Sequence, residues 1–226
     1  MSAEPSVNED ATIRIAGGYN GITSCVEGQP PRLLEKCTGY RTMVASPDAR
    51  YFAARSVLNM LSVWSTGSGK LLWEMPAGST RMPGFSTDSQ QVMVCGDGSL
   101  RGYAVQDGTL LWSTPVPGAH SGYVSASPDG RLLAVRTTGI TLHLFDARTH
   151  AMLCRLEHPD GAGPQHISWS PDSALLATCR GQHAVNVWNL RRLRAELRNM
   201  GLDWDHAPLP EPAALPRIVR VEGARQ

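Results

Sequence analysis

Short segments of alternating hydrophobic and polar residues recur along this chain. Residues 142–145 read LHLF and residues 185–188 read VNVW. Alternation of this kind places one face of a β-strand against a core and leaves the other face outside. Each segment follows a shorter apolar run rich in strand-forming residues, such as residues 132–135 and 175–178. The pattern therefore predicts pairs of short, consecutive strands.

A turn signal precedes each pair of strands. The signal is a Ser-Pro-Asp triplet, with threonine in place of proline in the second copy, and its copies lie 40, 41 and 43 residues apart. They occupy residues 46–48, 86–88, 127–129 and 170–172. Proline presets φ for a tight turn, and aspartate and glycine suit the positions that follow, so each triplet predicts a turn.

Two further series of landmarks keep the same period. An aromatic residue ends each alternating strand some 16 to 18 residues after the triplet, at Trp64, Tyr103, Phe145 and Trp188. A leucine-rich segment then leads to Trp73, to Trp112 and, more weakly, to Cys154. Together the three series predict a repeated unit of four antiparallel strands joined by tight turns, which is a blade of a β-propeller.

This set of landmarks resembles the WD40-repeat family over roughly residues 38–190. No repeat keeps the literal Trp-Asp pair, and no blade has all four members of the family's buried network of His, Ser/Thr, Asp and Trp. The fourth repeat, for example, keeps Thr178 and Trp188 but has His183 where the aspartate would be. Stability must then depend more on apolar packing between blades.

The expected fold is all-β, a WD40-like β-propeller segment with a short C-terminal helix. Its four blades should be centred near residues 38–76, 77–117, 118–157 and 158–190. WD40 rings usually have about seven blades, so four predict a segment that is incomplete or is completed by self-association as a homo-oligomer. The last blade lacks an outer strand after residue 190, and residues 32–37 are a candidate to supply it.

The two ends of the chain differ from the repeats. Residues 1–37 form an N-terminal segment in which 11–15 and 32–37 are the expected partial-blade strands. Residues 191–204 form an amphipathic helical segment that should pack its leucines and Met200 on the last blade, leave its arginines in solvent and end in a left-handed cap at Gly201. A membrane-surface or partner-binding helix is the alternative. Residues 205–226 are proline-rich and should form a flexible tail.

Composition narrows the range of partners. The chain has 226 residues, 42% of them hydrophobic, and a formal net charge of +1, so no strong global field attracts nucleic acid or a membrane. No apolar run approaches the roughly 18 residues of a membrane span. Residues 1–10 are polar and acidic, unlike a secretory signal. The five cysteines are scattered without a Cys-x-x-Cys pair, which favours reduced thiols in a cytoplasmic protein.

The sequence contains no recognised catalytic or cofactor motif. It has no Gly-x-Ser-x-Gly, phosphate loop or dinucleotide fingerprint, and its histidines show no metal-ligand spacing. We therefore expect a non-catalytic scaffold, without cofactor or metal, that binds a protein or peptide. The segment after the last repeat resembles the closing segment of large bacterial WD40 proteins, many of which carry a kinase domain upstream. A C-terminal remnant of a larger signalling protein is therefore the form we favour.

An oxidoreductase is the alternative function. The sequence Gly-x-Leu-Leu-Trp occurs twice, ending at Trp73 and Trp112, and it also resembles quinoprotein-like propellers. Those enzymes are secreted and much longer, and they need a calcium site and a cofactor cavity. The absence of a secretory signal and the Ser-Pro-Asp turns favour the scaffold.

The predicted binding site lies where the second strand of each blade ends. Three repeats have an arginine at or next to that point, and the set we propose for partner binding is Arg55, Arg136, Arg180 and His183. Converging guanidinium groups favour carboxylate or phosphate groups, so we expect an acidic peptide. Trp73, Trp112 and Tyr123 are candidates for apolar contacts. The alternatives left open are that the arginines are solvated or bind loop carbonyl groups, and that the tryptophans pack between blades.

Overall fold

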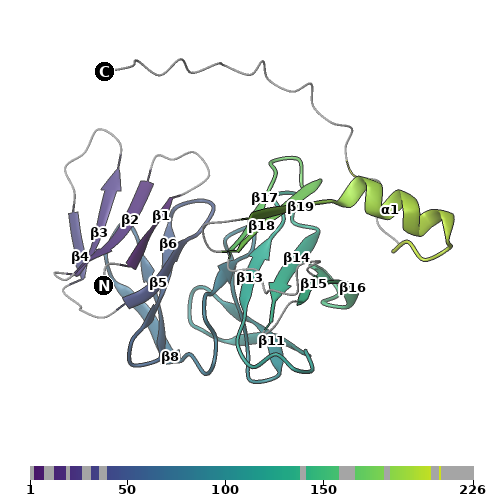
Figure 1. The fold of residues 1–226 in the computed structure, drawn as a ribbon. Coiled ribbons are helices and arrows are strands. Elements are labelled where there is room, and N and C mark those ends of the chain that lie inside the picture. The colour runs from purple at the N-terminus through teal and green to yellow at the C-terminus, as the bar shows by residue number, and fades with distance from the viewer. Residues whose placement is uncertain are drawn as a thin grey trace, which may run out of the picture.

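A computed structural model describes residues 3–7, 13–18, 21–26, 32–35, 40–137, 141–157, 166–180, 184–204 and 209. In these residues the chain forms five antiparallel sheets followed by one helix (Figure 1). Within each sheet the strands lie in chain order, so every strand is bonded to the one before it and the one after it. We call the first sheet the N-terminal sheet and the others blades 1 to 4.

The strand bounds are as follows. The N-terminal sheet contains β1 (Ala3–Val7), β2 (Ile13–Gly18), β3 (Gly21–Val26) and β4 (Arg32–Glu35). Blade 1 contains β5 (Tyr40–Ala45), β6 (Tyr51–Ser56), β7 (Met60–Ser65) and β8 (Leu71–Pro76). Blade 2 contains β9 (Gly84–Phe85), β10 (Gln91–Gly96), β11 (Ser99–Ala104) and β12 (Leu110–Pro115). Blade 3 contains β13 (Tyr123–Ala126), β14 (Leu132–Arg136), β15 (Thr141–Asp146) and β16 (Met152–Glu157). Blade 4 contains β17 (His166–Trp169), β18 (Leu175–Arg180) and β19 (Ala184–Asn189), and α1 (Leu190–Asn199) follows it directly.

The predicted all-β fold, its four blades and its short C-terminal helix are confirmed. As predicted, blade 4 has three strands among the described residues. The N-terminal segment is richer than predicted, because four strands are present where the sequence indicated two. The suggestion that residues 32–37 supply the outer strand of blade 4 is wrong for the described part, Arg32–Glu35. These residues pair with β3, for example Arg32 with Ser24, and so complete their own sheet.

The first strands of successive sheets lie side by side around a common centre. β1 contacts β5, β5 contacts β9, β9 contacts β13 and β13 contacts β17. The later strands of each sheet extend outward from this centre (Figure 1). The arrangement is that of a propeller, in which the first strands surround a channel and the turns lie along two rims.

Each Ser-x-Asp triplet is a turn held by the same set of hydrogen bonds. In blade 3, Ser127 Oγ donates to Asp129 Oδ1 over 2.6 Å and accepts from the N–H of Leu132 over 2.9 Å. The other three triplets make the equivalent serine–aspartate bond over 2.7, 2.5 and 2.5 Å. In every copy the residue after the aspartate has a positive φ. The sequence repeat is therefore a repeated side-chain network that closes the hairpin between the first two strands of a blade.

Two of these turns are also bonded to the next blade. The N–H of Asp48 donates to Ser89 Oγ over 3.1 Å, and the N–H of Asp129 donates to Ser173 Oγ over 3.0 Å. Both serines are fully buried. Gly130 holds the equivalent place in blade 3 and has no side chain, so this bond is not available at the joint between blades 2 and 3.

Apolar side chains fill the space between neighbouring blades. Leu61 and Val63 of blade 1 pack with Phe85 of blade 2 in one buried cluster. Within blade 1, Trp64 stacks on Phe52 with ring centroids 4.9 Å apart. The buried Nε1 of Trp64 has no hydrogen-bond partner among the described residues. Blade 1 is therefore stabilised by packing and not by a polar network through its tryptophan.

The outer face of blade 4 is open to solvent. Val185 and Val187 of β19 are 66% and 57% exposed, whereas their counterparts in β7, Leu61 and Val63, are 1% and 0% exposed. Blade 2 covers that face of blade 1. Among the described residues, no further strand follows β19 to cover the equivalent face of blade 4.

Helix α1 packs on blade 4 as predicted. Asn189 caps its first turn by accepting a backbone N–H. Its other end has the predicted left-handed residue, Gly201 with φ 71°, and the N–H of Leu202 donates to the carbonyl of Leu197 over 2.8 Å. Leu190 is fully buried in the core of blade 4. No helix in the described residues is long and apolar enough to cross a membrane.

One arginine of the helix is buried, contrary to the prediction that all would be solvated. Arg194 is 4% exposed, and its guanidinium binds the two carboxylate oxygens of Asp203 over 2.9 and 3.2 Å. The guanidinium also lies 5.2 Å from the ring centre of Trp204. Met200, which was predicted to pack on the blade, is 62% exposed. After the C-terminal cap the chain turns back and brings the Asp203 carboxylate to the helix. We call this ion pair, together with the ring of Trp204 beside it, the clasp.

Candidate functional site

The arginines predicted for partner binding lie along one rim of the propeller. The β6–β7 and β10–β11 turns belong to this rim, together with the β8–β9 and β12–β13 connections, because alternate strand ends of an antiparallel blade meet at the same edge. We call this edge the mouth rim. Arg55, Arg136 and Arg180 lie at the ends of β6, β14 and β18, which reach it. The side chain of Arg180 and the whole of His183 lie outside the described residues.

Arg55 is engaged within its own turn. Its Nε donates to Asn59 Oδ1 over 3.1 Å, and a second guanidinium nitrogen bonds to the same oxygen. Asn59 has a φ of 65°, and its side-chain amide donates to the carbonyl of Gly78 over 2.6 Å. Arg55 therefore ties the β6–β7 turn to the β8–β9 connection. This role resembles the alternative left open above, in which the arginines bind polar groups of the loops and not a partner.

Arg136 lies at the mouth of the central channel. Its strand neighbour in the β13–β14 register is Tyr123, and its guanidinium carbon lies 5.0 Å from the ring centre of that tyrosine. The side chain is partly buried, and its shielded Nε has no hydrogen-bond partner among the described residues. Burial lowers the pKa of the Arg136 guanidinium; Tyr123 opposes this effect and the charge of Arg81 adds to it. Arg136 thus presents a partly desolvated cation beside an aromatic ring.

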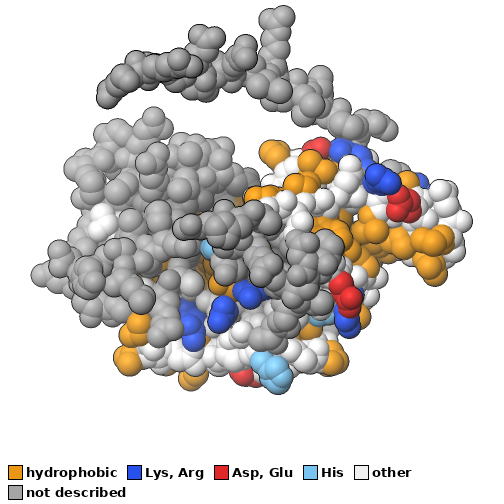
Figure 2. Space-filling view, in the orientation of Figure 1, with side chains coloured by type: hydrophobic (Ala, Val, Ile, Leu, Met, Phe, Trp, Pro, Cys, Tyr) orange, Lys and Arg blue, Asp and Glu red, His pale blue; other side chains and the backbone are white. Residues whose placement is uncertain are grey.

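Arg81 is a second cation at this place, and the sequence analysis did not identify it. Its N–H donates to the carbonyl of Gly122 over 3.1 Å, and its own carbonyl accepts from Thr42 Oγ1 over 3.0 Å. Two neighbouring blades therefore hold its backbone next to Tyr123. The sequence signal that could have identified Arg81 is its position three residues before the first strand of blade 2, where the chain enters the channel. Figure 2 shows Lys and Arg side chains gathered near the middle of the face in view.

Gly122 allows the β12–β13 connection to approach so closely. A Cβ at this position would lie 2.6 Å from the carbonyl oxygen of Arg136 and 2.8 Å from the side chain of Cys95. A larger residue would push the connection outward and displace the start of β13. The small residue therefore fixes the position of Tyr123 at the mouth.

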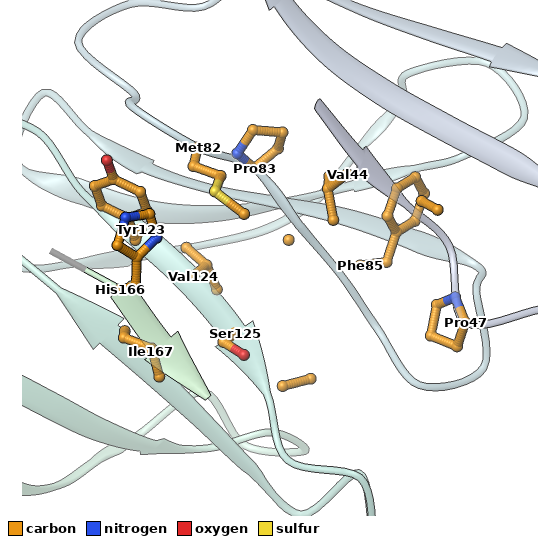
Figure 3. Close-up of a pocket in the computed structure, with 13 residues that line it drawn as sticks. Val44, Pro47, Met82, Pro83, Phe85, Tyr123, Val124, Ser125, His166 and Ile167 are labelled. Carbon is orange, nitrogen blue, oxygen red and sulfur yellow. The ribbon is translucent and has the colours of Figure 1, made fainter. Parts of the chain in front are cut away.

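The inner strands enclose a cavity of about 190 Å³ behind this mouth (Figure 3). Apolar side chains line it from several blades, among them Val44, Phe85, Val124 and Ile167. Tyr123 and His166 lie together at one end, with ring centroids 6.4 Å apart. Pockets for drug-sized ligands usually measure roughly 300–1,000 Å³. The volume of this channel is therefore below that range.

The tryptophans that were candidates for apolar contacts pack between blades. Trp73 Nε1 donates to the carbonyl of Val105 in the next blade over 2.7 Å. Trp112 stacks on His150 of blade 3, with ring centroids 3.7 Å apart. Tyr123, the third candidate, does line the channel. For the two tryptophans the structure therefore has the alternative arrangement, packing between blades.

The described residues offer little reactive chemistry. They contain no group of three or more His, Cys, Asp or Glu side chains arranged to hold a metal ion. Burial raises the pKa of Cys95 and of Cys154 to about 11, so both thiols stay protonated at neutral pH. A protonated, buried thiol is a poor nucleophile. At the mouth, the described residues place two cations beside an apolar channel.

Comparison with known proteins gives short matches. No family model matches the chain. Pre-mRNA-processing factor 19 from Oryza sativa subsp. japonica is 32% identical over 95 residues, which are 41% of this chain and 18% of that protein. WD repeat-containing protein 1 from Gallus gallus is 32% identical over 73 residues, which are 30% of this chain and 11% of that protein. The matches cover less than a fifth of either relative.

Proposed function

We propose that this chain, which is a β-propeller of the WD40-repeat type, is a protein-interaction module that binds a protein or peptide at the mouth rim. The observation that carries the proposal is the pair Arg81 and Arg136, held at the mouth of an apolar channel beside Tyr123. A rigid arrangement of blades that presents such groups from its turns is a binding platform. The similarity to a protein named for its WD repeats supports the same function.

The proposed partner is acidic. Guanidinium groups form charge-assisted, often bidentate hydrogen bonds with carboxylate and phosphate groups. Arg81 and Arg136 have no ion pair among the described residues, and two neighbouring like charges favour an anion between them. The formal net charge of +1 favours a peptide over nucleic acid, since domains that bind nucleic acid are usually strongly basic.

Rim-specific variants test this proposal. Leu58, which is 81% exposed, and His120 lie in turns of the mouth rim. Ser68 and Thr109 are exposed residues in turns of the opposite rim. A tagged chain is used to capture partners from its native cell, and L58E/H120E is compared with the matched control S68E/T109E. Loss of specific partners with L58E/H120E and their retention by S68E/T109E are expected. Equal capture by both folded variants and the unmodified chain would overturn the proposal.

We further propose that the chain acts without catalysis, in the cytoplasm. The scattered cysteines and the absence of catalytic motifs in the sequence support this. The oxidoreductase alternative makes a different prediction. Purified protein would then show the absorbance of bound quinone or a calcium-dependent reduction of dye. Robust turnover in either assay would overturn the non-catalytic proposal.

A further inference from the structure

We infer that the mouth binds a peptide carboxylate through Arg81 and Arg136 while a neighbouring apolar side chain of the same peptide enters the channel. This inference rests on the proposed interaction function and specifies its ligand. The site consists of Arg81, Tyr123, Arg136 and His166 at the mouth, with the cavity of about 190 Å³ behind them. We call it the carboxylate site.

Arg136 has no ion pair among the described residues. Its Nε is shielded from water and has no hydrogen-bond partner among the described residues. A buried donor without a partner is costly, and a charged one more so. Tyr123 holds the guanidinium by its ring face at 5.0 Å but supplies no anionic charge. A carboxylate beside the guanidinium would accept from its terminal nitrogens and balance the charge.

Arg81 supplies the second half of the site. Its side chain is exposed, whereas its backbone is fixed by Gly122 on one side and Thr42 on the other. Arg81 precedes Met82, whose backbone pairs with Tyr123, and Arg136 lies over the ring of the same tyrosine, so both arginines belong to one edge of the channel. Like charges at one edge repel, and an anion bound between them lowers that cost. A carboxylate has two oxygens and can accept from both arginines at once.

The apolar lining of the channel determines which kind of side chain can lie next to the carboxylate. Val44 and Phe85 line it on one side, and Val124 and Ile167 line it on the other (Figure 3). Tyr123 and His166 stand at its end beside Met82 (Figure 3). Met82 directly follows the exposed Arg81. An apolar side chain placed in this space leaves water while the adjacent carboxylate stays at the mouth. The expected ligand is therefore a peptide with an aliphatic residue next to, or bearing, the carboxylate.

The carboxylate can come from two sources, and labelled peptides distinguish them. The first probe is Gly-Ser-Gly-Ser-Gly-Leu with a free carboxyl terminus and a neutral fluorophore on its amino terminus, and its control is the same peptide as the C-terminal amide. The second probe, Gly-Ser-Gly-Glu-Leu-Gly-Ser as the amide with the same fluorophore, carries its carboxylate on a side chain, and its control has glutamine in place of the glutamate. A third peptide, with glycine in place of the terminal leucine, tests the channel. Binding to the purified chain is measured by fluorescence anisotropy at 50 and 300 mM salt.

We expect at least one carboxylate probe to bind and its uncharged control to bind about tenfold more weakly, a difference of about 1.4 kcal/mol. R136Q and R81Q should each weaken binding about tenfold, and higher salt should weaken it further. R131Q is the matched control, because Arg131 is an exposed arginine in a turn of the opposite rim, and its binding should match the unmodified chain. Circular dichroism verifies that each variant is folded.

Four results would overturn the inference: no binding by either carboxylate probe, equal binding of acid and amide, unchanged binding by R81Q/R136Q, or a stronger effect of R131Q than of R136Q. The proposed interaction function fails separately. If R81Q/R136Q captures native partners as well as the unmodified chain while L58E/H120E does not, the mouth rim binds partners and the carboxylate site is wrong.

Discussion

The substitution Arg194→Ala should destabilise the fold by about 2–3 kcal/mol. Removing one member of a buried ion pair typically costs about 3–5 kcal/mol, because the remaining charge is left without its partner. The Arg194 and Asp203 side chains are 5% and 11% exposed, so this pair is of the buried kind. Two features reduce the cost. Asp203 keeps a bond of 2.9 Å to Arg198, and the short segment after Gly201 can move toward water.

Urea unfolding followed by circular dichroism measures the effect. The matched control is Arg192→Ala, since Arg192 is 81% exposed and pairs with Glu196 four residues later, and such pairs contribute about 0.3–0.5 kcal/mol. A double-mutant cycle with Asp203→Ala should give a coupling energy of at least about 1 kcal/mol. A value for Arg194→Ala within about 0.5 kcal/mol of the control, or a coupling energy near zero, would refute the reasoning that the clasp anchors the helix.

Three other predictions concern the blades. Ser173→Ala should cost about 1 kcal/mol in urea unfolding, because the N–H of the preceding blade's turn aspartate loses its acceptor, whereas Ser68→Ala at an exposed turn should be nearly neutral. The hydroxyl of the turn serine and a helix arginine lower the pKa of Asp172 from 3.8 to about 2, so its contribution is complete above pH 3.8 and is lost as the pH falls through about 2. Asp172→Asn should therefore make stability less dependent on pH between these values, and an unchanged pH profile would contradict the assignment. Gly102→Ala should destabilise by about 1–3 kcal/mol, because its Cβ would lie 2.3 Å from the Trp112 ring, and a wild-type melting temperature would show that the ring is free to move.

The fold could be predicted where the repeat has a local chemical cause. Every Ser-x-Asp triplet builds its own turn from a serine hydroxyl, an aspartate and a following residue with positive φ. These bonds lie within about five residues, so the sequence alone identifies them. The N-terminal sheet has no such triplet, and two of its four strands were missed. The pairing of these strands depends on contacts between separate segments of the chain, and no short sequence motif predicts those contacts.

The candidate site shows the same limit more clearly. Arg55 and Arg136 have equivalent places in their repeats, yet one binds Asn59 within its turn and the other lies over Tyr123. The difference arises from the neighbouring residue: Asn59 lies across the turn from Arg55, and Tyr123 lies on the strand next to Arg136. Arg81 has no landmark of its own and reaches the mouth because two other blades hold its backbone. Sequence spacing predicts which rim a residue reaches, and tertiary neighbours decide what it can bind there.

The open face of blade 4 has a consequence for how such a protein changes in length during evolution. A blade presents to the next repeat a surface already shaped by the one before, and Val185 and Val187 lie where Leu61 and Val63 are covered. A duplicated repeat appended after β19 would meet an apolar surface of the right kind without any new interface having to arise. Because each repeat contacts only its neighbours, such an addition would leave the packing between the existing blades unchanged.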